Sequence, residues 1–555
     1  MDKIWHKFYE NNVPKNLEFP QISLSEILHK SVQNNPERTA LIFFGRKISY
    51  SELQSMVNRI ASALTSLCVK KGDRIALVLP NCPEFVIFYF AALKIGAIVV
   101  PTNPMYSSRE MKFQLKDCGA EILVILDVLY HKHKEAFVGS YVKKYIITSI
   151  QDFLPLAKSL IFPIKQWFEN IDHTVEKKEG TFFFKNLLKS NKEMLKSPSI
   201  DMEDLALLQY TGGTTGVSKG VMLTHRNLVA NAFQSRLWVP DLIDGQETTL
   251  VVLPLFHIFS LTVGLNASIL MAASIVLLPQ FKIKELLRSI EEYKVTLFLA
   301  VPTIFSVINN STLIKKYKMS SLKFCLSGGA ALPVEVLEEF ENRTSKKIIE
   351  GYGLSEASPV THVNPVSNNR KVGTIGLPVP GTDMKIVKGK LFKRSQSPEH
   401  DGELVVSGPQ VMKGYWNRPD ETKKVLSNGW LYTGDIAKMD EQGFCQILDR
   451  KKEMIIVGGN NVYPREIEEL LYEKPEIMEA AVIGLPDKDR GEYIKAFVVL
   501  KEGAFLTGED VIKYCKENLS QIKVPRRIEF KKDLPKSLIG KILKKTLKEE
   551  ELKKI

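Results

Sequence analysis

The sequence predicts an α/β protein with two domains: a large N-terminal domain of several lobes and a small α+β domain at the C-terminus. With 555 residues, the chain is too long for one ordinary hydrophobic core. Short apolar runs rich in β-branched residues alternate with helix-like stretches, which is typical of parallel sheets covered by helices. The pattern changes near the C-terminus, and we place the domain boundary between residues 449 and 450.

The alternation defines the larger domain, residues 1–449. A helix-like stretch covers residues 49–67. Several strand-like runs end in Pro or Gly where a helix pattern begins, so we expect ligand-facing loops at the carboxyl ends of parallel strands. These runs lie at residues 73–80, 96–104, 121–127, 247–256, 295–303 and 321–329.

Two segments depart from the alternation. Residues 372–408 consist of turns and short strands, and we expect a small β-rich lobe there. Residues 156–200 are aromatic and rich in lysine, which indicates a surface insertion. Its large apolar side chains either form an amphipathic element that contacts a membrane or pack against their own domain; they are Ile161, Phe162, Trp167, Phe168 and Phe182–Phe184.

The smaller domain, residues 450–555, has a pattern of its own. It predicts a helix at 464–476, strands at 480–487 and 493–500, and a helix at 509–519. The tail at 543–555 is rich in lysine, and we interpret it as a helix with a solvated face.

Charge and cysteine usage exclude some classes of function. Lys and Arg total 76 against 63 for Asp and Glu, a net charge of +13, which suits acidic ligands. No basic stripe is interleaved with aromatic residues, so we expect no nucleic-acid partner. The six cysteines lie far apart with no CxxC pair, which favours reduced structural thiols over a zinc site or a disulfide framework.

Two apolar runs, residues 85–100 and 261–278, are candidates for membrane spans. The first is interrupted by Lys94 and is too short, and the second contains several polar residues, so we expect buried core helices instead. The N-terminus has no apolar segment of the secretory type. We therefore expect a cytoplasmic protein; peripheral contact with the inner face of a membrane and a homodimer are left open.

The segment 207–227, LLQYTGGTTGVSKGVMLTHRN, contains a loop suited to phosphates. Such a loop needs glycines for close backbone approach, together with hydroxyl groups and a cation. A surface turn is the alternative, and a Walker A loop is excluded because two residues separate Gly216 from Lys219. The residues concerned are Thr211, Gly212, Gly213, Thr214, Thr215, Gly216, Ser218 and Lys219.

Five motifs in order resemble the signatures of the adenylate-forming superfamily, and the first is similar to that of bacterial long-chain fatty acyl-CoA ligases. The chain departs from the usual pattern at Gly212, Ser218 and Ser355, which stand where Ser, Pro and Thr are usual. The motifs are YTGGTTGVSKG (210–220), EGYGLSEAS (350–358), YTGD (432–435), LDRKKEMIIVGGNNVYPREIEE (448–469) and LPKSLIGKI (534–542).

The resemblance implies an adenylation domain, a mobile C-terminal domain, and the use of ATP, Mg²⁺ and coenzyme A. It implies that a carboxylic acid is converted to an acyl-adenylate with release of pyrophosphate and then transferred to CoA. Glu356 and Thr211 would hold Mg²⁺, which prefers one or two protein oxygens. Lys541 would be the catalytic lysine, and His257 would lie beside the acyl carboxylate.

The resemblance also implies a nucleotide and CoA site. Tyr352 would stack on adenine, Asp435 would accept the ribose hydroxyls with Arg450 beside it, and Lys452 would be the hinge. Gly458, Gly459 and Asn460 would face the CoA thiol. The remaining members of this set are Thr211, Gly212, Gly213, Thr214, Thr215, Gly216, Lys219, Gly329, Ala330, Gly351, Gly353 and Ser355.

The acid substrate is expected to be a fatty acid of medium or long chain. The resemblance implies that residues 256–265, residues 301–305 and the glycines near 328 and 351 line the acyl pocket. These stretches carry no charge that could pair with an amino group. An aryl or cinnamate-type acid is the nearest alternative. A non-catalytic nucleotide-binding scaffold is the alternative from another class.

Overall fold

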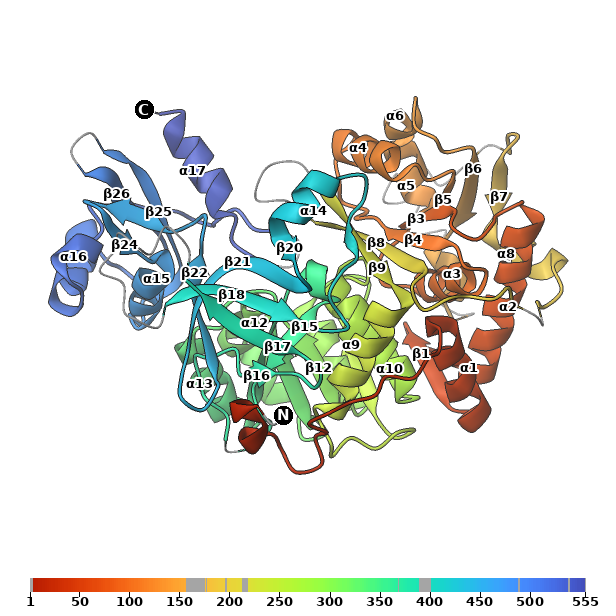
Figure 1. The fold of residues 1–555 in the computed structure, drawn as a ribbon, viewed down its shortest axis with the longest axis horizontal. Helices are drawn as coiled ribbons and strands as arrows, with labels where there is room; N and C mark the ends of the chain where they lie inside the picture. The colour runs from red at the N-terminus through yellow and green to blue at the C-terminus, as the bar shows by residue number, and fades with distance from the viewer. Residues whose placement is uncertain are drawn as a thin grey trace.

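We describe the fold from a computed structural model. It describes residues 3–155, 175, 177–194, 197–211, 218–367, 369–388, 401–487, 490–537 and 540–554. Figure 1 shows a large body, coloured red to cyan, and a smaller blue domain at one end that is joined to it through β21 and β22.

The large body is built on two mostly parallel sheets. Among the described residues, one sheet has nine strands in the order β16 (Leu377–Pro378), β15 (Val360–Val363), β14 (Ile348–Gly353), β13 (Phe324–Ser327), β12 (Leu297–Ala300), β10 (Thr248–Val251), β11 (Ser274–Leu277), β1 (Thr39–Phe43) and β2 (Arg46–Ser49). The other has the order β19 (Gly414–Tyr415), β9 (Lys219–Thr224), β8 (Leu205–Thr211), β4 (Ile98–Pro101), β3 (Arg74–Val78), β5 (Ile122–Leu126), β6 (Lys144–Thr148) and β7 (Thr181–Phe183).

A third, antiparallel sheet forms the predicted β-rich lobe beside them. It consists of β17 (Asp383–Val387), β18 (Gly402–Ser407), β20 (Leu426–Ser427), β21 (Trp430–Met439) and β22 (Cys445–Arg450). The predicted lobe at 372–408 therefore extends to residue 450, because β18 pairs with β21 and β21 with β22.

Helices cover both large sheets. Their order is α1 (Leu24–Asn34), α2 (Tyr50–Ser66), α3 (Pro83–Lys94), α4 (Ser108–Cys118), α5 (Asp127–Lys132), α6 (Lys134–Phe137), α8 (Phe184–Ser190), α9 (His225–Leu237), α10 (Ala267–Leu270), α11 (Ile283–Glu292), α12 (Pro302–Asn310), α13 (Val334–Thr344) and α14 (Pro419–Val425). The helix expected at 49–67 is α2, which begins at a capping box between Ser49 and Glu52.

The last sheet and its helices have a hydrophobic core of their own. The strands are β23 (Ile455–Val457), β24 (Asn460–Val462), β25 (Ile477–Asp487), β26 (Gly491–Leu500) and β27 (Arg527–Phe530), and the helices are α15 (Pro464–Tyr472), α16 (Gly508–Asn518) and α17 (Lys544–Leu552). Side chains between 455 and 547 form its buried clusters. The expected helix–strand–strand–helix order is present. The boundary at 449/450 stays a prediction.

The two apolar runs are buried, but neither is a single helix. Residues 85–100 span most of α3 and most of β4, and residues 261–278 span most of a π-helical turn (η3, Ser260–Asn266), α10 and β11. Each run is mostly apolar, as expected for a helix and a strand that are both enclosed, and the polar residues of the second run are buried with it. No helix within the described ranges is long and apolar enough to cross a membrane.

The structure partly tests two further predictions, the surface insertion at 156–200 and the basic tail at 543–555. Phe184 is buried, with its ring 5.8 Å from that of Phe88, so this end of the insertion packs against its own domain. Phe182 and Phe183 lie on β7 and are partly buried, whereas Ile161, Phe162, Trp167 and Phe168 lie outside the described residues. The basic tail forms α17, but Lys544 is largely buried, with Nζ 2.8 Å from Glu468 Oε1, so only part of the helix is solvated.

Candidate functional site

Four polar side chains meet where the β-rich lobe joins the C-terminal domain. Asp435, on β21, accepts a hydrogen bond of 2.5 Å from the Tyr352 hydroxyl at the end of β14. Arg450 ends β22 and pairs in register with Asp435, with Nε 3.5 Å from Oδ1. The Lys541 ammonium interacts electrostatically with both. The structure thus brings together four of the residues singled out in the sequence, and we call Tyr352, Asp435, Arg450 and Lys541 the Asp435 cluster.

The charges in this cluster depend on one another. Burial raises the pKa of Tyr352, and the Asp435 carboxylate raises it further, so the phenol keeps its proton and donates a hydrogen bond to Asp435. Burial lowers the pKa of Arg450, but Asp435 and Glu453 outweigh it and hold that pKa above its usual value. The pKa of Lys541 is lowered to about 8, first by burial and then by the Arg450 guanidinium.

The backbone beside Tyr352 leaves no room for side chains. A Cβ at Gly351 would lie 3.1 Å from Leu326 Cδ1, and a Cβ at Gly353 would collide with the Pro359 carbonyl oxygen. Gly329 and Ala330 follow the neighbouring strand β13 and are exposed. The backbone on either side of Tyr352 is therefore tightly packed, and exposed backbone lies at the end of the neighbouring strand.

A second group is joined by Tyr415, on β19. Thr211 and Lys219 face each other across β8 and β9. The Lys219 Nζ lies 5.0 Å from the centre of the Tyr415 ring, and the Tyr415 hydroxyl donates a 2.8 Å hydrogen bond to Glu356 Oε1. Glu356 belongs to a 3₁₀ turn that begins at Ser355 (η5, Ser355–Ala357). Tyr415 thus contacts both Glu356 and Lys219, the residue that pairs with Thr211.

His257 follows β10 and belongs to the segment 256–265. We call this segment, together with residues 301–305, the apolar wall. Its Nδ1 accepts a 3.3 Å hydrogen bond from the Phe259 backbone N–H. Burial lowers the pKa of His257 to about 4, so the imidazole is neutral at physiological pH. The Phe259 ring lies 3.1 Å from the position of a Cβ at Gly328, the residue that directly follows β13. The apolar wall therefore lies beside the carboxyl end of β13.

The loop that carries Lys541 rests on the large body. Gly540 has a φ of +73°, and a Cβ there would collide with Thr303 Oγ1 in α12. Thr303 belongs to the segment 301–305 singled out as a pocket wall. The loop therefore packs against this wall at Gly540, while the Lys541 ammonium interacts with Asp435 and Arg450.

The expected hinge residue is exposed, and the expected CoA-facing residues form a turn within the C-terminal domain. Lys452 is exposed. Gly458 and Gly459 form the turn between β23 and β24, with φ of +56° and +81°, and the Gly458 N–H donates to the Arg490 carbonyl of the same domain at 2.8 Å. Asn460 begins β24. Lys541 thus faces the cluster, whereas the glycine turn packs within its own domain.

Five residues of the glycine-rich loop lie outside the described residues: Gly212, Gly213, Thr214, Thr215 and Gly216. Thr211 and Ser218 flank them, and the Ser218 hydroxyl donates to the Thr211 carbonyl at 2.6 Å.

Sequence reasoning did not identify Tyr415 or Glu421, which contact Glu356 and Lys219. Both belong to the segment GYWNRPDE at 414–421. Its Gly, Asn and Pro signal a turn, but no local pattern indicates that the turn lies against residues far away in sequence.

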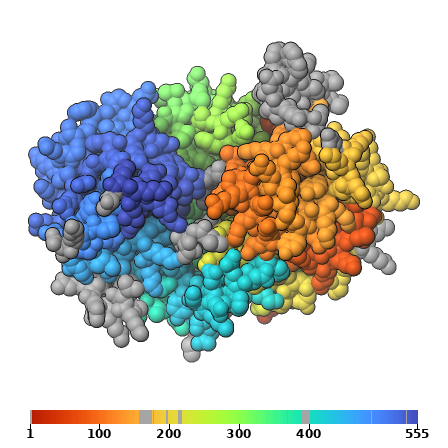
Figure 2. All heavy atoms as spheres, turned by 90° about the horizontal axis from the view of Figure 1, so that it is seen from above, coloured from red at the N-terminus to blue at the C-terminus, as the bar shows by residue number. Residues whose placement is uncertain are grey.

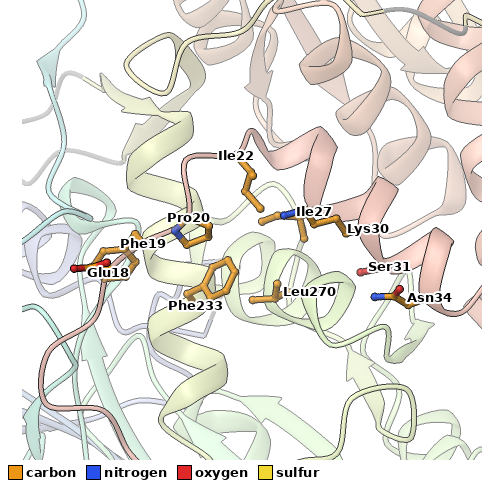
Figure 3. Close-up of a pocket in the computed structure, with 10 residues that line it drawn as sticks. All are labelled: Glu18, Phe19, Pro20, Ile22, Ile27, Lys30, Ser31, Asn34, Phe233 and Leu270. Atoms are coloured by element: carbon orange, nitrogen blue, oxygen red, sulfur yellow. The ribbon is translucent and has the colours of Figure 1, made fainter.

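A surface cavity of about 510 Å³ lies elsewhere (Figure 3). The N-terminal segment, α1, α9 and α10 enclose it, and none of its lining residues belongs to the two groups above. They are Glu18, Phe19, Pro20, Ile22, Ile27, Lys30, Ser31, Asn34, Phe233 and Leu270.

Two family models match the chain. One, described as AMP-binding enzyme, matches residues 28–416, and the other, AMP-binding enzyme C-terminal domain, matches residues 466–541. Among curated proteins, the chain is 45% identical over 551 residues to the long-chain-fatty-acid–CoA ligase of Bacillus subtilis (strain 168), covering 99% of this chain and 98% of that protein. It is 38% identical to the long-chain-fatty-acid–CoA ligase of Escherichia coli O157:H7, with the same coverage.

Solved structures agree over nearly the whole length. ATP-bound MatB from Rhodopseudomonas palustris superposes with a TM-score of 0.82 at 28% identity, covering 96% of this chain and 99% of that one. The anthranilate CoA ligase AuaEII in complex with anthranoyl-AMP superposes with a TM-score of 0.84 at 26% identity, covering 96% of this chain and 98% of that one.

Proposed function

Because this chain belongs to the AMP-binding enzyme family, we propose that it is an ATP-dependent long-chain fatty acid–CoA ligase. The observation that carries the proposal is the cluster of Tyr352, Asp435, Arg450 and Lys541, which combines a ring, a carboxylate and two cations at one sheet edge. Such a set suits a nucleotide and the charge that develops when its phosphate reacts.

In the first half-reaction, the fatty acid carboxylate oxygen attacks the α-phosphorus of ATP, and the bond to the bridging oxygen of pyrophosphate breaks. This chemistry needs charge neutralisation more than an acid or a base. We assign the ribose hydroxyls to Asp435, the adenine face to Tyr352, and the meeting point of the carboxylate and the α-phosphate to Lys541.

In the second half-reaction, the CoA thiolate attacks the acyl carbonyl carbon, and AMP leaves with the electrons of the broken C–O bond. We propose that residues 450–555 form a mobile domain that turns about Lys452, withdraws Lys541 and brings Gly458, Gly459 and Asn460 to the thiol path. His257, neutral at physiological pH, would lie beside the acyl carboxylate without adding charge.

The residues around Glu356 fit a magnesium ion. Glu356 Oε1 accepts from Tyr415, while Oε2 accepts no hydrogen bond from the described residues and is left for a cation. Carboxylate and hydroxyl oxygens are ligands that Mg²⁺ prefers, so Glu356 and Thr211 would hold it. When bound, Mg²⁺ neutralises negative charge on the phosphate oxygens.

The apolar wall favours a fatty acid over a charged or amino acid. Phe305 and Leu261 are fully buried, and the segments that contain them carry no ionised side chain. We place the enzyme in the cytoplasm, because its six cysteines are all free thiols, as is usual in reducing compartments.

The test measures pyrophosphate and AMP release by the purified protein with ATP and Mg²⁺, across fatty acids of increasing length and a cinnamate-type acid, each with and without CoA. We expect turnover that depends on CoA and peaks with a long alkyl acid. A peak at the aryl acid would transfer the proposal to an aryl-CoA ligase. Absence of acid-dependent release from every acid would favour a non-catalytic scaffold.

A further inference from the structure

We propose that Glu421 competes with the phosphates of the nucleotide for the Lys219 ammonium, and so sets the affinity for ATP and the release of pyrophosphate. The inference rests on the proposed function, because it takes Lys219 as a phosphate ligand. Glu421 acts through Lys219 and is therefore a positioning residue.

Lys219 and Glu421 form an ion pair that is partly shielded from water. The Lys219 ammonium pairs with the Glu421 carboxylate and lies over the Tyr415 ring. The side chain of Lys219 is 17% exposed and that of Glu421 is 32% exposed, so water screens this pair less than a surface ion pair. The hydrogen bond from Lys219 is the largest cause of a lowered pKa at Glu421.

A network behind Glu421 fixes its position. Arg418 reaches Glu421 Oε1 at 3.5 Å and Asp117 Oδ1 at 3.2 Å. The Tyr210 hydroxyl, beside Thr211 on β8, donates to Asp117 Oδ2 at 2.6 Å. The Trp416 backbone N–H donates to the Gly220 carbonyl at 2.8 Å. The segment with Glu421 is therefore tied to both strands that flank the phosphate loop, and Glu421 cannot follow Lys219 freely.

The consequence is an exchange of partners. One ammonium has three N–H donors and a single charge, so strong contacts with the triphosphate must weaken its pair with Glu421. The same exchange runs in reverse after chemistry: Glu421 recaptures Lys219 as pyrophosphate departs. Glu421 therefore weakens the binding of both ATP and pyrophosphate.

The test uses the full chain and the isosteric variant Glu421→Gln. ATP binding is measured by titration calorimetry without acid, and pyrophosphate is assayed as an inhibitor of turnover. We expect ATP to bind about two- to fivefold more tightly, and the inhibition constant of pyrophosphate to fall by a similar factor. The matched control is Asp420→Asn, which removes the neighbouring charge from the same first turn of α14 and which we expect to leave both constants near wild type.

A double-mutant cycle shows whether Glu421 acts through Lys219. In a Lys219→Ala background, Glu421→Gln should change ATP affinity no more than Asp420→Asn does. Unchanged or weaker ATP binding by Glu421→Gln, or an equal gain without Lys219, would overturn the inference. Because these measurements compare variants of a protein that binds ATP, failure of wild type to bind ATP would instead contradict the proposed function.

Discussion

The Lys541 ammonium interacts electrostatically with two cations, Arg450 and Lys544, and with two anions, Glu453 and Asp435. Burial and Arg450 lower its pKa to about 8, so the group is charged below that pH and loses its charge as pH rises through it. If Lys541 supplies charge to the reacting phosphate, the first half-reaction should depend on pH in the same window.

We expect kcat/KM for acid-dependent pyrophosphate release to fall above about pH 8 in the wild-type protein, and Lys541→Ala to lower it about 10²–10³-fold at pH 7. Lys541→Arg keeps a charge that does not titrate in this range, so its alkaline decline should shift to higher pH. The measurement is a pH–rate profile of the three proteins. An identical alkaline decline in Lys541→Arg would assign it to another group.

The sequence identified the individual residues of the Asp435 cluster better than their contacts. Tyr352, Asp435, Arg450 and Lys541 stand in motifs that can be recognised one by one. The 2.5 Å bond from Tyr352 to Asp435 joins residues 83 positions apart, and no local pattern encodes it. Tyr415 belongs to none of the motifs and was missed for the same reason.

At the level of helices and strands, the sequence predicted an element correctly where the residues of that element stabilise it themselves. The capping box of Ser49 and Glu52 begins α2 within one residue of the predicted start. In contrast, two-residue strands such as β16 and β19 exist only because β15 and β9 pair with them. Their own residues carry too little periodicity to predict a strand.

The loop between β27 and α17 offers a test of how packing positions Lys541. Gly540→Ala would place a Cβ against Thr303 Oγ1 and push the loop away from α12. We expect pyrophosphate release to slow at least tenfold, while transfer from a preformed acyl-adenylate to CoA changes little. Stopped-flow assays of the two half-reactions provide the comparison.

Gly503→Ala is the matched control for that variant. Gly503 has a φ of +78°, close to the +73° of Gly540, but nothing lies within 4 Å of its Cβ position. Both variants carry the same backbone strain, so a difference between them reports the contact with Thr303. Equal losses of activity in the two variants would show that strain alone is responsible.

At the scale of the whole molecule, the C-terminal domain has its own core, and its Lys541 loop reaches α12 and the Asp435 cluster. The sequence predicted two domains because the pattern of elements changes. The packing between them could not be predicted, since it depends on surfaces that form only after each core has folded.

The exposed Lys452 provides a test of domain movement. Lys452→Pro restricts the backbone at the proposed hinge, and we expect adenylate formation within about threefold of wild type but CoA transfer reduced at least tenfold. Lys452→Ala removes the side chain without fixing φ and should retain both steps. Rapid-quench measurements of acyl-AMP and acyl-CoA separate them. Equal loss of both steps in Lys452→Pro would contradict a hinge at this residue.

The nine-stranded sheet has a consequence for synthesis on the ribosome. Phe43 on β1 pairs with Leu277 on β11, about 230 residues later in the chain. Because the ribosome adds about 5–20 residues per second, about 10–50 s pass between the synthesis of β1 and that of β11. During this time the nascent chain presents an unpaired edge whose last four residues, ALIF, are buried in the finished protein. We therefore expect this N-terminal segment to be the part of the newborn chain that most needs a chaperone.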